Sequence, residues 1–346
     1  MPKATTLSLA AILAGLASAA GTALVRRLAL RHAVLDVPNE RSLHAAPTPR
    51  GGGIAIAAVS LVAIAVIGLT GTVAPRTTIG LVGGGLVVAL VGWLDDLRGV
   101  RPRTRLVCHI AAAIWLTAWL SGVTQLRFGS STLALGPAGW VVAVLGITWM
   151  INLYNFMDGI DGLAGGEAVI VACLGGLGLL AADQPGLAAA TLIVAAASAG
   201  FLVFNWPPAR IFMGDVGSGL LGFLLAGLGL ASERAGGPAA LTWVLWLGVF
   251  VVDATITLAR RFARGERWFA AHKSHAYQRA VQGGWTHGQV SAAALTLTAM
   301  LGGLGWVAEL RPRLALAAGG FGLLVLLLVY LSVERHRPMY TTPPAS

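Results

Sequence analysis

The chain has 346 residues, of which 56% are hydrophobic and only 11% are charged, and its mean hydropathy is +0.78. Soluble domains carry about 25% charged residues, so this composition excludes an ordinary soluble protein and indicates a polytopic membrane protein. The net charge of +10 could indicate that the protein binds nucleic acid. Membrane proteins have a similar excess of positive charge, because their cytoplasmic loops are rich in Arg and Lys.

Eleven apolar segments have a length close to the ~17–25 residues that a membrane-spanning helix needs. They cover residues 5–25, 52–72, 77–94, 105–123, 138–154, 163–182, 186–204, 216–232, 239–259, 288–308 and 313–333. We therefore expect an all-α polytopic fold of about 11 transmembrane helices with catalytic cytoplasmic loops. It would form a single domain over residues 1–346, with a disordered tail at 334–346.

The basic residues predict the orientation of these segments. The connections that follow odd-numbered segments, with the C-terminal tail, hold 18 of the 24 Lys and Arg residues. By the positive-inside rule these connections face the cytoplasm, so the N-terminus is outside and the C-terminus inside. The dispersal of the cations over several loops argues against nucleic acid. Ala17-Ser18-Ala19 resembles a signal-peptide cleavage site, but the basic block that follows it favours an uncleaved first helix.

A polar stretch between two apolar segments, N-L-Y-N-F-M-D-G-I-D-G-L at 152–163, is the most unusual feature of the chain. On a helix, Asn152, Asn155 and Asp158 stay within an arc of ~120° and could face one cavity. The glycines at 159 and 162 permit a tight turn before Asp161. Polar groups at the edge of the membrane are costly, so we interpret the stretch as part of a functional site.

Two further clusters precede this stretch. The loop at 38–53, P-N-E-R-S-L-H followed by P-T-P-R-G-G-G, is either an ordinary cap of the next helix or an arginine-bearing loop that approaches an anion closely. Asp95 and Asp96 end the third segment, where carboxylates oppose the helix dipole. They could bind a divalent cation, act as a base, or pair with Arg98 and Arg101.

Two clusters follow it. Asp215 stands among glycines just before the eighth segment, as a helix cap or in a phosphate site at a helix N-terminus. His272, Lys273 and His275 lie in the last large loop, which is either a solvated basic loop or part of the site. A zinc site is disfavoured, because no third ligand is near. Acidic and basic ligands on one membrane face together predict a Mg²⁺–diphosphate site for phosphoryl transfer.

These motifs, in this order, resemble those of the polyprenyl-phosphate N-acetylhexosamine-1-phosphate transferases, the MraY/WecA superfamily. The resemblance covers residues 36–287 and rests on the five clusters quoted above, including F-N at 204–205 and F-M-G-D-V-G-S at 212–218. It implies an integral enzyme of the bacterial inner membrane with a cytoplasmic active site. Such enzymes move a sugar-1-phosphate from a UDP-sugar to undecaprenyl phosphate and release UMP.

The resemblance also implies roles for residues. Asp215 and Asn155 match the positions that hold Mg²⁺, with Mn²⁺ as a substitute. Asp95 and Asp96 match a pair near the lipid phosphate, one of which is the favoured base. Asp158 and Asp161 match acidic residues of the same cavity. The positions matching substrate-binding residues are Asn152, Asn205, Arg50, His272, Lys273 and His275.

The last loop bears on the donor sugar. The peptidoglycan branch carries consecutive histidines, whereas this chain has H-K-S-H at 272–275. This form is similar to the O-antigen-initiating branch, so we expect an N-acetylated amino sugar such as UDP-GlcNAc, UDP-FucNAc or UDP-QuiNAc. A muramoyl-pentapeptide donor is the alternative. Direct attack and a covalent aspartyl intermediate both stay open, as does a homodimer formed through glycine-rich outer faces.

A secondary transporter of an anionic solute is the competing class of function. Transporters bind their solute near the bilayer midplane, often between inverted repeats. Here the polar clusters stand at the cytoplasmic ends of the segments and no repeat is evident, which favours the enzyme.

Overall fold

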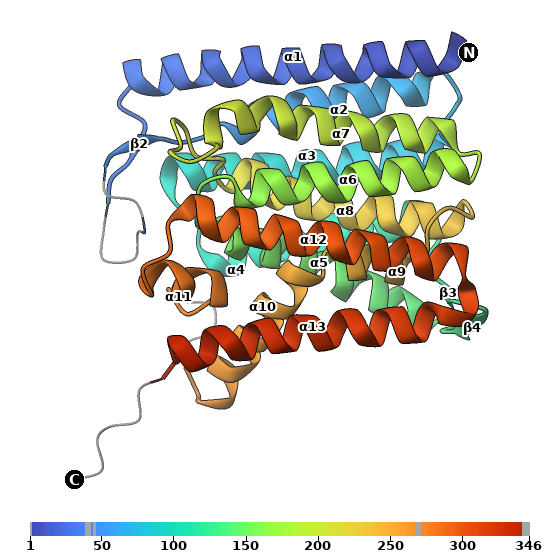
Figure 1. Ribbon diagram of the computed structural model, residues 1–346. Coiled ribbons are helices and arrows are strands. Elements are labelled where there is room, and N and C mark those ends of the chain that lie inside the picture. The colour runs from blue at the N-terminus through green and yellow to red at the C-terminus, as the bar shows by residue number, and fades with distance from the viewer. Residues whose placement is uncertain (1, 39–42, 44–45, 267–271, 341–346) are drawn as a thin grey trace.

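The computed structural model describes residues 2–38, 43, 46–266 and 272–340. The described chain is mostly helical with almost no sheet, which confirms the predicted all-α class (Figure 1). The long helices run side by side, and α1 begins at the end of the bundle opposite to that at which α13 ends. The helices are α1 (Pro2–Arg31), α2 (Gly53–Leu69), α3 (Pro75–Arg98), α4 (Pro102–Trp119), α5 (Ala138–Met157), α6 (Leu163–Ala181), α7 (Pro185–Asn205), α8 (Asp215–Arg234), α9 (Ala240–Trp246), α10 (Gly248–Ala263), α11 (Ala276–Gln282), α12 (His287–Leu310) and α13 (Ala315–His336).

The predicted number of about eleven spanning helices is not confirmed. A helix occupies every predicted segment, but within the described residues only eight are long and apolar enough to cross a membrane. The number rises to nine if α9 and α10, which are bent by 78°, form one broken span. α2 has only 17 residues. α4 opens with Arg103 and Arg105 and carries His109, which lowers its hydropathy.

Two antiparallel hairpins add the only strands of the described chain. β1 (Leu35–Asp36) pairs with β2 (Thr48–Pro49) just before α2, and β3 (Gln125–Phe128) pairs with β4 (Ser131–Ala134) between α4 and α5. The second hairpin lies at the end of the bundle that holds the N-terminus (Figure 1). The tail that we expected to be disordered from residue 334 is helical through His336, and residues 341–346 lie outside the described part of the chain.

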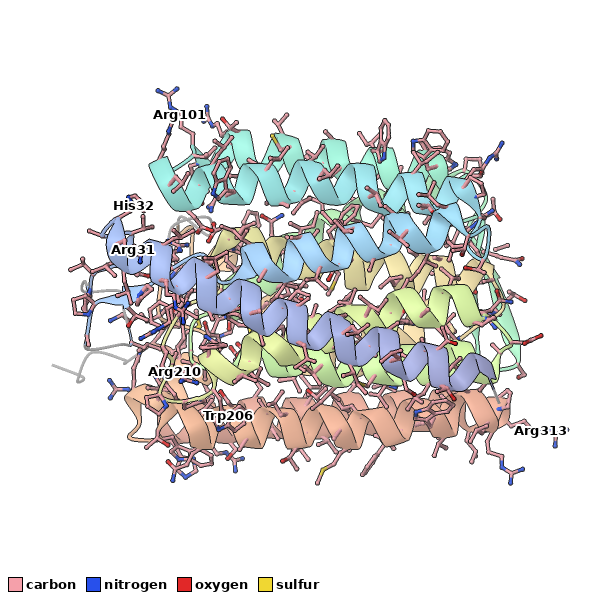
Figure 2. The ribbon with its side chains drawn as sticks, turned by 90° about the horizontal axis from the view of Figure 1, so that it is seen from above. Arg31, His32, Arg101, Trp206, Arg210 and Arg313 are labelled. Carbon is pink, nitrogen blue, oxygen red and sulfur yellow. The ribbon has the colours of Figure 1, made fainter. Side chains whose placement is uncertain are left out.

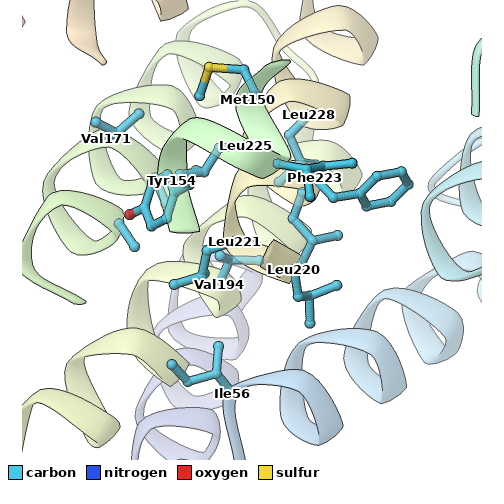
Figure 3. Packing of buried hydrophobic residues seen from close by; sticks show 14 of the residues in the cluster. Ile56, Met150, Tyr154, Val171, Val194, Leu220, Leu221, Phe223, Leu225 and Leu228 are labelled. Carbon is cyan, nitrogen blue, oxygen red and sulfur yellow. The ribbon is translucent and has the colours of Figure 1, made fainter. Parts of the chain in front are cut away.

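α8 forms the centre of the bundle. Its candidate span is 83% buried, whereas those of α1 and α13 are 17% and 28% buried. The helix carries leucines and a phenylalanine around its circumference, as expected of a helix with neighbours on all sides. Figure 3 shows Leu220, Leu221 and Phe223 of this helix packed among residues such as Ile56 and Tyr154. Its first residue is Asp215, which therefore stands at the start of the central helix.

Basic side chains gather at one end of the bundle. Figure 2 shows Arg31, Arg101 and Arg210 there, with Arg313 at the opposite end. α1, α3 and α5 end at this basic end, and α8 begins there. The predicted site residues of these helices are thus brought to one end of the molecule, which we call the site end.

Candidate active site

Three aspartates and two arginines form an ion-pair cluster at the site end. The Asp215 carboxylate contacts Arg50 through Oδ1 at 2.7 Å and Arg105 through Oδ2 at 2.6 Å. Arg50 also pairs with Asp96 at 2.8 Å, and Arg105 pairs with Asp95 at 2.5 Å. Asp95 and Asp96 are therefore ion-paired, as one interpretation expected, but their partners are Arg50 and Arg105 instead of Arg98 and Arg101.

Asp96 fixes α3 against the start of α8. Its two carboxylate oxygens accept hydrogen bonds from the backbone N–H groups of Asp215, at 2.9 Å, and Val216, at 3.2 Å. The first N–H groups of a helix have no partner within the helix, so a carboxylate satisfies them well. The helices approach closely here, because a Cβ added to Gly92 would lie 2.5 Å from the Asp215 carbonyl oxygen.

The glycine-rich loop at 51–53 packs against the loop before α8. Its N–H groups donate to carbonyl groups of the loop before α8: Gly52 to Phe212 at 2.9 Å and Gly53 to Met213 at 2.9 Å. Gly53 also packs directly against Gly217. The glycines thus allow two backbones to meet, and this contact carries Arg50 to the aspartates. Residues 39–42, 44 and 45 of the preceding motif lie outside the described chain.

A cavity of about 200 Å³ opens beside this cluster. Six predicted site residues line it: Arg50, Asn155, Asp158, Asp161, Asn205 and Asp215. Asp36, Gln278 and His287 line it as well and were not predicted. The cavity therefore places the hard oxygen ligands of the central motif beside Arg50, which Asp215 links to Arg105.

The central motif turns as its glycines predicted. α5 ends at Met157, and Gly162 adopts a left-handed conformation with φ of 79° before α6 begins. Asp161 lies in this turn, where its carboxylate accepts from the Ala209 N–H at 2.9 Å and lies 3.3 Å from His287. Asn155, one turn back on α5, donates to the Ser218 hydroxyl at 3.0 Å.

Asn205 links the turn to the loop before α8. Its side-chain oxygen accepts from the Gly162 N–H, and its side-chain nitrogen donates to the Ile211 carbonyl, both at 3.0 Å. The residue is only 3% exposed, so it supports the cavity wall and presents little surface to a ligand.

Asn152 is not among the residues that line the cavity. Its side chain donates to the Thr148 carbonyl at 2.7 Å and lies 3.3 Å from His109 of α4. It stands one turn deeper in α5 than Asn155, where α4 covers that face of the helix.

The predicted histidines lie near the cavity, but neither they nor Lys273 are among its lining residues. His275 is 2% exposed, 3.4 Å from Asp253 of α10, with its ring centroid 4.8 Å from that of His272. α11 takes their place: Gln278 lines the cavity, and the Tyr277 hydroxyl donates to the Phe156 carbonyl at 2.9 Å. Residues 267–271 of this loop lie outside the described chain.

The surroundings shift the ionisation of several groups outside the helices. Burial lowers the pKa of the Arg50 guanidinium, but Asp96 and Asp215 outweigh this effect and raise its pKa above the ordinary value. Desolvation raises the pKa of Asp158 well above its usual range, although Arg50 opposes the shift. Burial, helped by His275 and Arg261, lowers the pKa of His272 to about 3, so its imidazole is neutral at physiological pH.

Comparison with known proteins identifies the family. Residues 78–233 match the model of glycosyl transferase family 4. The chain is 33% identical over 318 residues to the decaprenyl-phosphate N-acetylglucosaminephosphotransferase of Mycolicibacterium smegmatis, covering 81% of this chain and 77% of that protein. The chain belongs to glycosyl transferase family 4. This family is the MraY/WecA superfamily that the motifs indicated.

Other relatives differ in the sugar group that their names specify. A probable undecaprenyl-phosphate N-acetylglucosaminyl 1-phosphate transferase of Bacillus subtilis is 29% identical over 77% of this chain and 75% of its own length. A phospho-N-acetylmuramoyl-pentapeptide-transferase of Synechococcus is 35% identical over 64% of this chain and 68% of its own length. This chain is thus a multi-pass, membrane-bound phospho-sugar transferase. Family membership rules out the transporter interpretation.

Arg105 is the main residue that the sequence interpretation missed. It lies ten residues after Asp95 and on the next helix, so their contact cannot be recognised from the spacing in the sequence. Pro102 gives the one available signal: proline favours the first turn of a helix, so α4 begins there and carries Arg105 back toward the end of α3.

Proposed function

We propose that the enzyme transfers an N-acetylated amino-sugar 1-phosphate from a UDP-sugar to undecaprenyl phosphate, releasing UMP. The observation that carries this proposal is the Arg50–Asp215–Arg105 cluster beside the polar cavity. It offers two guanidinium groups for phosphate oxygens and several hard oxygen ligands for a cation. A diphosphate–metal substrate needs both kinds of group at one place.

In the proposed reaction an oxygen of the lipid phosphate attacks the β-phosphorus of the UDP-sugar. The bond from that phosphorus to the oxygen bridging the two phosphates breaks, and UMP leaves. Arg50 and Arg105 would pair with phosphate oxygens and stabilise the charge that develops. We assign the base to one carboxylate of the Asp95–Asp96 pair, which would keep the lipid phosphate ionised. Both carboxylates are already held in place: Asp96 accepts from the first N–H groups of α8, and Asp95 accepts from the Val100 N–H and from Arg105.

Asp215 and Asn155 are the residues that we propose to hold Mg²⁺, with Mn²⁺ as a substitute. Within the described residues, no group of three or more His, Cys, Asp or Glu side chains forms a ready-made metal site. Mg²⁺ commonly uses one or two protein carboxylates and takes its other ligands from water and substrate phosphates, so this donor set fits. The ion would neutralise charge on the diphosphate. Removal of divalent ions with EDTA should abolish activity, and added Mg²⁺ should restore it.

Asp158 and Asp161 would shape the donor side of the cavity. Because desolvation raises the pKa of Asp158, this carboxyl group is suited to donate a hydrogen bond to a substrate oxygen. Asn205 would act mainly through the cavity wall that its two hydrogen bonds support. Asn152, His272, Lys273 and His275 do not line the cavity, so their proposed effect on the substrate becomes indirect.

The site end would face the cytoplasm of a bacterial inner membrane, where UDP-sugars are available. Its basic side chains support this orientation by the positive-inside rule. We also propose initiation of a surface polysaccharide such as O-antigen as the biological role, on the H-K-S-H form of the loop at 272–275. A homodimer through the apolar outer faces stays a prediction.

A donor panel tests the proposal. Purified protein with undecaprenyl phosphate and Mg²⁺ should release UMP from at least one of UDP-GlcNAc, UDP-FucNAc and UDP-QuiNAc. UDP-N-acetylmuramoyl-pentapeptide should give none; turnover of this donor alone would favour the peptidoglycan alternative. If no donor in the panel yields UMP, the proposed reaction is wrong.

A further inference from the structure

The end of α13 is joined to α10 and α11, the two helices that flank the loop at 272–275, which we call the histidine loop. Glu334 accepts two hydrogen bonds from the guanidinium of Arg260 on α10, at 2.6 and 2.9 Å. The same carboxylate accepts one from Arg279 on α11, at 2.6 Å. The chain then turns back, so that the Met339 N–H donates to Glu334 at 3.2 Å and the Tyr340 ring lies 3.6 Å from the Arg264 guanidinium.

Arg279 extends this junction to the histidine loop. Its side chain is 2% exposed and forms an ion pair with Glu334. Its Nε donates to the Ser274 carbonyl at 3.1 Å, and Nη1 donates to the Arg337 carbonyl at 2.8 Å. Ser274 lies between His272 and His275, so one guanidinium ties the backbone of that loop to α13. A buried cation of this kind depends on its carboxylate partner.

The other side of α11 faces the cavity. Gln278 lines the cavity and accepts from the His275 N–H at 3.2 Å, which fixes the start of the helix. The Tyr277 hydroxyl holds the Phe156 carbonyl, two residues before Asp158. Arg279 lies on the same short helix as Tyr277 and Gln278, since α11 has only seven residues. A shift of Arg279 would therefore move α11 and, with it, a wall of the cavity.

We propose that Glu334 is a positioning residue for this wall: through Arg279 it sets the place of α11 and of the loop at 272–275 for binding of the UDP-sugar. The inference rests on the proposed function of the cavity. It assigns to the last helix, which lies outside the motif-bearing part of the chain, a part in substrate recognition.

The test compares Glu334→Gln with Arg335→Gln in the purified full-length protein. Arg335 is the exposed neighbour on the same helix, so its variant also changes one charge at this end of α13. Hydrogen–deuterium exchange over residues 272–282 reports the anchoring, and the KM for the donor reports recognition. Glu334→Gln should raise both the exchange rate and the KM about tenfold, since it removes charge-assisted hydrogen bonds, with kcat changed by about twofold at most.

Each outcome has a defined meaning. Exchange in Glu334→Gln equal to that in Arg335→Gln, or faster exchange with an unchanged KM, would overturn the proposal. If Glu334→Gln does not give folded protein, Arg279→Lys replaces it: this variant keeps the charge but loses the planar fork that joins Ser274 to α13. Absence of UMP from wild-type protein with every donor would refute the proposed function, while the exchange rates would still decide whether Glu334 holds the wall.

Discussion

Asp215 is the residue on which the site converges. Each of its carboxylate oxygens contacts a different arginine, while its own N–H is held by Asp96. The sequence alone predicted that Asp215 and Asn155 would share a cavity with Asp158 and Asp161. It did not predict the arginine partners or His287, because their contacts join positions far apart in the chain, without a characteristic spacing.

Asp215→Asn tests this residue. The amide removes one negative charge from the proposed metal ligand and the partner of two arginines, so UMP release should fall by at least about 100-fold. Steady-state rates with the preferred donor measure the effect. Asp183→Asn is the matched control: Asp183 is exposed in the turn between α6 and α7, and asparagine tolerates its positive φ of 55°. Equal rates for the two variants would contradict the assignment.

His272 gives the protein a pH-dependent stability. Its pKa is lowered from 6.5 to about 3 in the folded state, so protonation favours unfolding. The stabilisation is complete above pH 6.5 and is lost as the pH falls toward 3. Between pH 7 and 4.5, the Tm of wild-type protein in detergent should therefore decrease more than that of His272→Gln. Parallel decreases in a thermal-shift series would show that the imidazole is not desolvated.

At the level of elements, the site depends on how closely α3 and α2 approach α8. The apolar segments of the sequence located these helices to within a few residues, because each has an uninterrupted apolar run. The break between α9 and α10 was not predicted. Its one local cue is Gly248, which is uninformative in a chain with 46 glycines.

Gly92→Ala tests the contact between α3 and α8. The new methyl group would press on the Asp215 backbone, and overpacking of this kind costs about 1–3 kcal/mol. We expect a lower Tm and at least a tenfold loss of UMP release, because Asp96 and Asp215 would be displaced from each other. Gly303→Ala on α12 is the control, since nothing lies within 4 Å of its added methyl group. A fully active Gly92→Ala enzyme would show that this contact does not position the site.

At the scale of the whole molecule, the fold brings the described parts of the five motif clusters to one end of the helices. Composition predicted a membrane protein, and the distribution of Arg and Lys predicted which end of the helices carries most of the basic residues. The number of spans could not be predicted from segment length, because α2 is short, α4 begins with basic residues, and α9 bends into α10.

Cysteine labelling tests the orientation. In a background with Cys108 and Cys173 replaced, Ser131→Cys in the β3–β4 hairpin should react with a membrane-impermeant maleimide in intact cells. Arg335→Cys at the site end should react only after permeabilisation. Both positions are exposed in the protein, so a difference in labelling reports the side of the membrane. The reverse pattern would place the site end outside the cell.

The most direct test of the account follows the β-phosphorus of the donor. With UDP-GlcNAc, or whichever donor releases UMP, labelled with ³²P in the β-phosphate, the account predicts that the label enters the lipid product in an amount equal to the UMP formed. Transfer of the sugar alone would leave the label in soluble UDP. Label recovered as UDP, with none in the lipid fraction, would contradict sugar-1-phosphate transfer by this protein.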